Sequence, residues 1–227
     1  MTVLSAIQSA SVRLNEPRPQ FAFSDSTQYA VEVTELANET AVAIAKAADW
    51  RKLHKLYTFT GTGQTAFPLP SDYDRMPLKA SMFSTRSRLP LVQVQSIDDW
   101  LQLQILPVVG YPGRWILTGG LIELLPTLMQ GEEVKFYYIT KNIVSGDKPR
   151  FTDDADEFML SERLLTLGLI WRFRALKGLD YGEDLKNYDI ALSEEAGRDK
   201  GSRTVAIGAP RIPAGIELAY PGTVIVP

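Results

Sequence analysis

The sequence predicts an α+β protein: a four-helix bundle of two N-terminal and two C-terminal helices, a β-rich sandwich-like insertion between the two pairs, and an extended C-terminal tail. Three observations lead to this fold class. Apolar residues recur with a helical period in residues 1–50 and 146–200, alternate along residues 51–145, and lie among prolines without a helical period in residues 201–227. We take these four ranges as the parts of the chain.

Residues 1–50 are expected to form two helices. The first spans residues 3–14 and ends at NEPRPQ, because the prolines of that segment cannot continue a helix. The second runs from about Ser26 to Ala48 and is opened by SDST, a run of residues that cap helix N-termini. Many alanines in this second helix suit close packing against other helices.

Glycines, prolines and alternating apolar residues replace the helical pattern in the insertion. Residues 55–59 and 65–69 alternate on either side of GTGQ, which predicts a hairpin. Two strands are expected across TRSR, a further hairpin across the glycine pair at 119–120, and the clearest strand at residues 134–140, VKFYYIT. A helical turn is expected at IDDWLQL. Some seven short strands of this kind are typical of a small sandwich or a curled sheet.

The segment from Asp153 to Gly178 is expected to hold the central helix of the bundle. It is apolar around most of its circumference, so it must pack on two sides. Gly168 lacks a side chain and lets a neighbouring helix come close, and Gly178 stands where a left-handed residue ends a helix. A last, amphipathic and half-exposed helix is expected from Gly182 to about Arg198.

Composition excludes several classes of function. The net charge of −3 provides no basic field that would hold nucleic acid or an anionic membrane. The chain has no cysteine, which excludes disulfides and thiolate metal sites and fits a reducing cytoplasm. The N-terminal residues lack the pattern of a secretory signal, and no run reaches the roughly 18 apolar residues of a membrane span.

No catalytic residue, metal ligand or cofactor is predicted, so we expect that the protein is not an enzyme. His54 is the only histidine, and without cysteine or a GxSxG motif we expect no nucleophile–base triad. Four acids lack the ligand spacing of a calcium loop and are interpreted as helix-start acids. They are Asp153, Asp154, Asp156 and Glu157. An alternative interpretation pairs carboxylates as in glycosidases. Its candidates are Asp72, Asp74, Asp98 and Asp99.

Arg86 and Arg88 mark the one local concentration of basic residues, at the tip of a predicted loop. A solvated loop is the ordinary interpretation of such a pair. The alternative is that these two arginines contact DNA or an acidic partner.

The tail combines apolar character with prolines, whereas a disordered tail is usually polar and charged. Short apolar strands need another sheet edge to satisfy their backbone groups. Either the tail folds back on the insertion of its own chain, or it docks on another chain. We favour docking, because the insertion lies far away in the sequence. The predicted docking residues are Val205, Ile207, Ile212, Ile216, Leu218, Tyr220, Val224 and Val226.

Four stretches, in their order along the chain, resemble the head-to-tail adaptor (connector) proteins of tailed bacteriophages. They are LSAIQSASVRL, LANETAVAIAKAADWRKL, GTGQTAFPLPSDYDRM and DDADEFMLSERLLTLGLIWRFRALKGLDYGEDLKNYDIAL. The resemblance covers roughly residues 1–200. The well-developed insertion is similar to that of the short-tailed-phage members.

The resemblance implies a structural virion protein at the head–tail junction, made and assembled in the cytoplasm of the bacterial host. It implies a ring of this chain, expected to be a dodecamer, beneath the portal protein. The helical part would build the ring, the insertion would face the tail (nozzle or tube) proteins, and the tail segment would grip the portal. Such a ring serves tail assembly and DNA ejection. Genomic DNA would pass through its channel without specific binding.

Two other classes remain open from the sequence. A virion-associated cell-wall glycosidase would need two carboxylates that line a cleft. A β-sandwich module that binds a receptor or a saccharide would need exposed tryptophans or tyrosines clustered on one face of the insertion.

Overall fold

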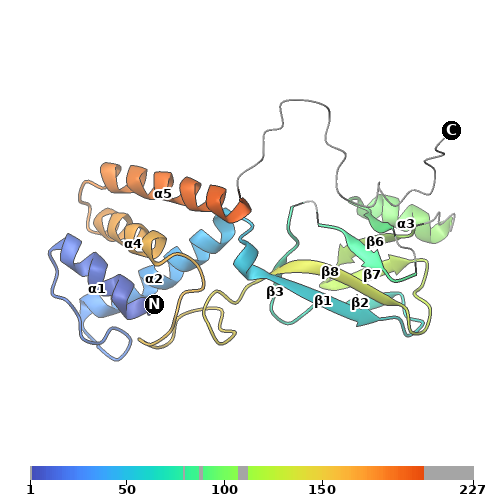
Figure 1. The fold of residues 1–227 in the computed structure, drawn as a ribbon, viewed down its shortest axis with the longest axis horizontal. Helices are drawn as coiled ribbons and strands as arrows, with labels where there is room; N and C mark the ends of the chain where they lie inside the picture. The colour runs from blue at the N-terminus through green and yellow to red at the C-terminus, as the bar shows by residue number, and fades with distance from the viewer. Residues whose placement is uncertain (1, 79, 87–88, 107–111, 202–227) are drawn as a thin grey trace, which may run out of the picture. The chain divides into compact units, whose positions relative to one another are not determined.

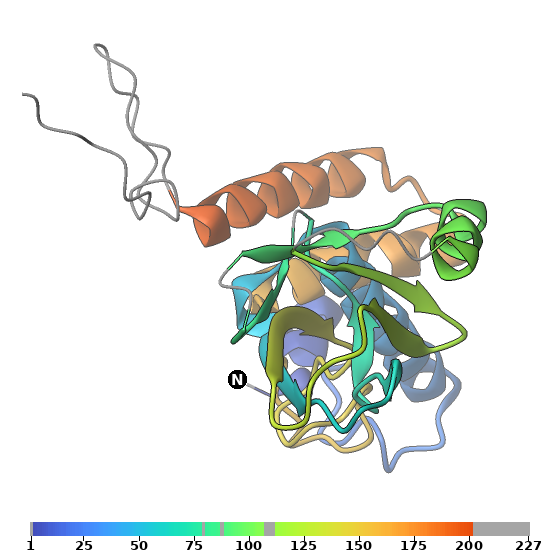
Figure 2. The same ribbon diagram turned by 90° about the vertical axis from the view of Figure 1, so that its right-hand side faces the viewer.

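The computed structural model describes residues 2–78, 80–86, 89–106 and 112–201. In this part of the chain the structure is mixed α and β, with five α-helices and a large sheet that curls nearly into a barrel (Figures 1 and 2). The chain divides into two compact units. The helical unit comprises residues 2–57, 69–80 and 136–201, and the sheet unit comprises residues 58–68 and 81–135, apart from the undescribed positions. The predicted α+β class is confirmed.

Four of the helices lie in the helical unit. They are α1 (Val3–Leu14), α2 (Gln28–Ala47), α4 (Glu162–Leu176) and α5 (Gly182–Lys200). The hydroxyl of Thr2 caps the start of α1 and that of Thr27 caps α2, each by accepting a backbone N–H of the first turn. A short 3-10 helix, Arg51–Leu53, follows α2.

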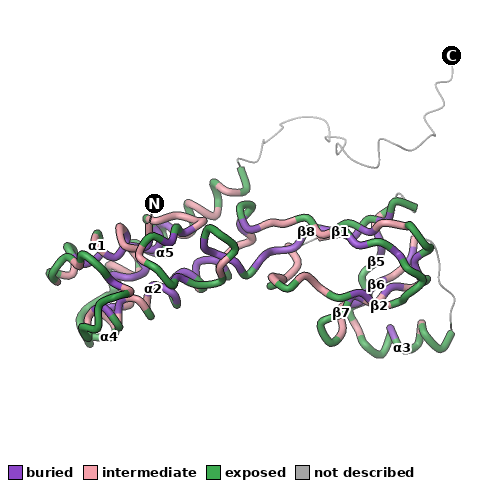
Figure 3. Tube along the Cα trace, turned by 90° about the horizontal axis from the view of Figure 1, so that it is seen from below, coloured by how far each residue is buried: buried purple, intermediate pink, exposed green. Residues whose placement is uncertain are grey.

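Helix α4 is the centre of the helical unit, because it packs against α1, α2 and α5. Its apolar residues are buried on more than one side, as the sequence predicts. Gly168 faces Thr40 of α2 so closely that an added Cβ would lie 2.3 Å from the Thr40 methyl carbon. The buried stretches of these helices appear purple in Figure 3.

Ion pairs fix the direction of α4 along α2. Lys177 Nζ lies 2.6 Å from a carboxylate oxygen of Glu32, and Arg172 pairs with Glu39. The C-terminal end of α4 therefore lies beside the N-terminal end of α2, and the two helices run antiparallel.

Within the described residues, eight strands form the sheet. They are β1 (His54–Thr60), β2 (Ala66–Pro68), β3 (Tyr73–Arg75), β4 (Met82–Ser84), β5 (Pro90–Gln93), β6 (Arg114–Thr118), β7 (Leu121–Leu125) and β8 (Glu133–Thr140). The order is β1-β8-β4-β5-β6-β7-β2, and β3 pairs with β8. Of the two predicted arrangements, a small sandwich and a curled sheet, the observed strand order corresponds to the curled sheet. Strands β1 and β8 each belong in part to both units.

The one parallel pair described in the sheet joins β5 to β6. A parallel pair needs a crossover connection, which contains helix α3 (Ile97–Ile105). Trp100 fixes α3 to the sheet: its ring is buried with Val94 and Ile116, and its indole N–H donates to Glu123 at 2.9 Å.

The predicted hairpins have different outcomes. The β6–β7 hairpin is confirmed, and Gly119 and Gly120 both have positive φ, as its two-residue turn requires. The β4–β5 pair is also confirmed. The predicted hairpin around GTGQ is wrong, since β1 neighbours β8 and β2 pairs with β7. Alternation identifies strands, but it does not identify their partners.

Candidate functional site

All eight predicted docking residues of the tail, from Val205 to Val226, lie outside the described residues, so their role stays a prediction. Arg88 lies outside them as well. Arg86 is exposed in the turn after β4, where its backbone N–H donates to the Ser84 hydroxyl at 3.1 Å.

The acids that precede α4 order a loop. Asp154 accepts the backbone N–H groups of Ala22 and Phe23, and Asp156 accepts those of Thr152 and Asp153. Because α4 begins only at Glu162, the interpretation of Asp154 and Asp156 as helix-start acids is wrong.

Asp156 is almost fully buried in this loop, and burial opposes its charge. Its ion pair with Lys148 at 2.6 Å and the two backbone donors outweigh burial, so the pKa of the Asp156 carboxyl is lowered. No group of three or more acidic or histidine side chains suited to a metal ion occurs among the described residues.

His54 has a local structural role at the start of β1. Its Nδ1 lies 2.8 Å from the carbonyl oxygen of Trp50 and donates to it, which ties the start of the strand to the residue that precedes the 3-10 helix.

The carboxylates considered for a glycosidase have other partners in the structure. Asp72 accepts hydrogen bonds from Lys55, Tyr138 and Thr140 at 2.8–2.9 Å. Burial opposes its charge, but these three donors together hold the pKa of Asp72 at about 2. Burial, together with the same contact with Asp72, raises the pKa of Tyr138 to about 12.

Asp74 pairs with Arg75, while Asp98 and Asp99 lie in the first turn of α3 in the sheet unit. A carboxylate held ionised by three donors is a poor proton donor, which disfavours Asp72 as a general acid.

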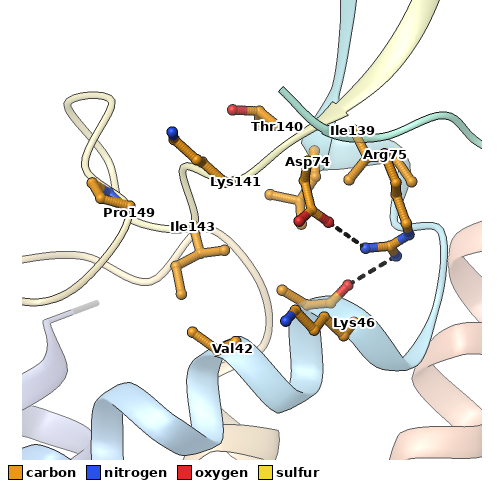
Figure 4. Close-up of a pocket in the computed structure, with 11 residues that line it drawn as sticks. Val42, Lys46, Asp74, Arg75, Ile139, Thr140, Lys141, Ile143 and Pro149 are labelled. Atoms are coloured by element: carbon orange, nitrogen blue, oxygen red, sulfur yellow. Dashed lines mark hydrogen bonds and ion pairs between the residues drawn. The ribbon is translucent and has the colours of Figure 1, made fainter. Parts of the chain in front are cut away.

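The helical unit contains an open hollow with a largely apolar lining (Figure 4). It lies between the C-terminal half of α2, strands β3 and β8, and the loop that follows β8. Its volume of about 220 Å³ is below the roughly 300–1,000 Å³ of sites for small-molecule ligands. The apolar lining residues are Val42, Ala45, Leu53, Ile139, Ile143 and Pro149.

Arg75 forms one wall of this hollow and closes the C-terminus of α2. Its guanidinium donates to the carbonyl oxygens of Ala45 (3.2 Å) and Ala48 (2.9 Å) and pairs with Asp49. It also pairs with Asp74 (Figure 4). A cation at the end of a helix is favoured by the helix dipole. This role of Arg75 could not be inferred from the sequence, because Ala45, Ala48 and Asp49 lie 26 to 30 residues away along the chain.

Two lysines lie at the rim of the hollow. Lys46 and Lys141 are exposed, and neither forms an ion pair with a residue that the structure describes. The hollow therefore combines a buried apolar floor with a cationic rim.

Helix α3 presents a second apolar surface, in the sheet unit. Ile97, Leu101 and Ile105 are spaced four residues apart along the helix, and all three are exposed. Among the described helices, none combines the length and the apolar character that a membrane span requires.

A small apolar hollow and an exposed apolar helix face are typical of a protein that contacts other chains. A sequence model of the SU10 adaptor protein family matches residues 1–209, most of the chain, so the protein belongs to this family. It is thus a bacteriophage adaptor protein, a structural component of the virion, and the resemblance to phage adaptors is confirmed. No curated protein matches the chain.

Proposed function

We propose that this protein forms a ring between the portal and the tail, bridges the filled head to the tail components and continues the DNA channel. The observation that carries the proposal is the family match, which extends over both the helical and the sheet unit. We assign the chain to the short-tailed-phage type of connector, with a dodecameric ring, because its insertion is well developed.

Each part of the chain has a proposed task. The bundle of α1, α2, α4 and α5 builds the ring, and the sheet unit faces the nozzle or tube proteins. The exposed apolar face of α3 supports the proposed contact of the sheet unit with tail proteins, because such a contact would remove this apolar surface from water. The apolar tail after Gly201 grips the portal.

The proposed role is structural and not catalytic. Asp72, the most perturbed carboxylate among the described residues, is fully engaged by its donors. A saccharide-binding face is disfavoured by the tryptophans: Trp50, Trp100 and Trp115 are buried, and Trp171 packs on Tyr181 and Tyr188. The net charge of −3 suits a channel through which DNA passes without being held.

Removal of residues 201–227 tests the proposed portal contact. We expect the shortened chain to keep the folded helical and sheet units but to lose attachment to purified portal protein, because the tail supplies the apolar contact. Co-sedimentation with portal measures attachment, and circular dichroism of the shortened chain controls for folding. Portal binding equal to that of the full chain would contradict the portal role of the tail.

A further inference from the structure

We propose that the hollow between α2 and strands β3 and β8 receives the α4–α5 turn of a neighbouring copy of this chain. Leu179 and Tyr181 are its apolar contacts, and the acids Asp180 and Glu183 face the lysines at the rim. This inference rests on the ring proposed above and identifies two surfaces that meet in it.

The hollow is suited to receive one or two side chains. Leu53, Ile139 and Ile143 are almost completely buried beneath it, so its floor is fixed by the core of the helical unit. In its wall Asp74 pairs with Arg75, which also pairs with Asp49, and the lining charges without a partner among the described residues are those of Lys46 and Lys141. An apolar segment that carries acidic side chains complements this surface.

The α4–α5 turn has the complementary composition. Leu179 and Tyr181 are 57% and 40% exposed, so both are available for contact with another chain. Asp180 and Glu183 are exposed and form no ion pair with a described residue. Two of the nearby bases are paired within the same unit: Arg174 pairs with Asp184, and Lys177 pairs with Glu32.

The turn is also rigid. Gly178 adopts φ +69°, its N–H donates to the Ala175 carbonyl oxygen, and the Leu179 N–H donates to that of Arg174 at 2.9 Å. These two bonds form the Schellman motif that closes a helix C-terminus. The ring of Tyr181 packs on Trp171 with centroids 6.3 Å apart. A preorganised projection loses little conformational freedom when it docks.

Helix α2 separates the two surfaces. The turn lies beside its N-terminal end, since Lys177 pairs with Glu32, and the hollow is lined by Val42, Ala45 and Lys46 near its C-terminal end. At 1.5 Å per residue, the fourteen residues from Glu32 to Lys46 correspond to about 20 Å. Two different surfaces at opposite ends of one unit join copies head to tail, and such a contact closes into a ring when the rotation between copies permits.

Cross-linking of the purified full-length protein tests the contact, because the chain has no cysteine of its own. Val42→Cys, at an exposed residue that lines the hollow, and Leu179→Cys in one chain, treated with a short bis-maleimide, are expected to give a ladder of covalent oligomers. A mixture of the two single-cysteine variants is expected to give dimers only, since each chain can then form one link. The matched control replaces Leu179→Cys with Ser193→Cys, at an exposed position of α5.

Charge exchange gives an independent readout. Lys46→Glu with Lys141→Glu places like charges across the contact, as does Asp180→Lys with Glu183→Lys. On the cysteine background, either pair is expected to reduce the ladder about tenfold, and all four changes together should restore it. Circular dichroism of each variant controls for folding.

The outcomes distinguish this contact from the ring itself. A ladder that requires both cysteines and responds to charge exchange supports the inference. Rings in electron micrographs without a ladder above the Ser193→Cys control would overturn the contact and leave the proposed function in place. Absence of both the ladder and rings, with portal protein as well as without it, would overturn both.

Discussion

Asp72 connects three segments of the helical unit. It lies in the loop before β3, and its donors come from β1 through Lys55 and from β8 through Tyr138 and Thr140. Lys55 also pairs with Asp147 after β8, and the hydrogen bonds to both carboxylates raise its pKa. An ionised acceptor inside such a network is strongly hydrogen-bonded, and its loss leaves several donors without a partner.

We expect Asp72→Asn to lower the free energy of unfolding by about 1–2 kcal/mol at neutral pH. The folded pKa of about 2 lies below the ordinary value of 3.8, so the ionised carboxylate stabilises the fold above about pH 4. This contribution is lost as the pH falls towards 2, and the two proteins should become equally stable there. Urea unfolding at several pH values measures the difference.

Asp147→Asn is the matched control. Asp147 contacts the same lysine, but its side chain is mostly exposed, and its backbone is left-handed, a conformation that asparagine tolerates. We expect an effect of at most a few tenths of a kcal/mol, as for other surface pairs. An equal loss of stability in both variants would contradict the role assigned to Asp72.

The packing of α4 against α2 depends on one missing side chain, that of Gly168. A Cβ there would lie 2.3 Å from Thr40 Cγ2 and 3.3 Å from Tyr188 Cε2. Since Thr40 and Tyr188 belong to α2 and α5, an added methyl group would press on two of the helices that surround α4. The packing of α4 therefore depends both on its apolar surface and on the close approach of α2 that Gly168 permits.

Gly168→Ala is expected to lower the free energy of unfolding by about 1–3 kcal/mol, the usual cost of an extra methyl group in a packed core. Thr40→Ala in the same chain removes the clashing methyl and should recover part of the loss. Chemical denaturation of the single and double variants measures both effects.

Gly197→Ala provides the comparison in α5, where no atom lies within 4 Å of an added Cβ. There the better helix propensity of alanine should raise the free energy of unfolding by up to about 1 kcal/mol. A Gly168→Ala variant that is also stabilised would show that α4 and α2 do not pack as described.

At the scale of the whole molecule, the charge balance bears on the proposed channel. With a net charge of −3 and many of the described bases already paired with acids, the protein has little to offer a phosphate backbone. We expect no retention of the full chain on double-stranded DNA at about 0.15 M salt, where exposed charges are screened. A mobility-shift titration measures this. Tight binding that weakens steeply with added salt would contradict passive passage of DNA.

The assembly predictions belong to the same scale. The removal of residues 201–227 tests the proposed contact with the portal protein. The cysteine and charge variants test the proposed contact between neighbouring copies in the ring. The cysteine and charge variants change residues that are exposed in a single copy, so we expect them to leave the folded units intact.

Features that depend on neighbours along the chain could be predicted from the sequence by itself. The apolar circumference of α4, the close approach at Gly168, the helix end at Gly178 and the turn at Gly119 and Gly120 all follow from local period, side-chain size and backbone preference. The order of these elements also led to the family resemblance that the family match confirms.

Only the tertiary structure decided which distant segments meet. It separated β1 from β2, paired β2 with β7, placed Arg75 at the end of α2, and brought Lys46 and Lys141 to the rim of one hollow. Strand partners and surface hollows arise from contacts between residues that are far apart in the chain. A single sequence carries period and propensity, which report on nearest neighbours, and no comparable signal for such long-range contacts.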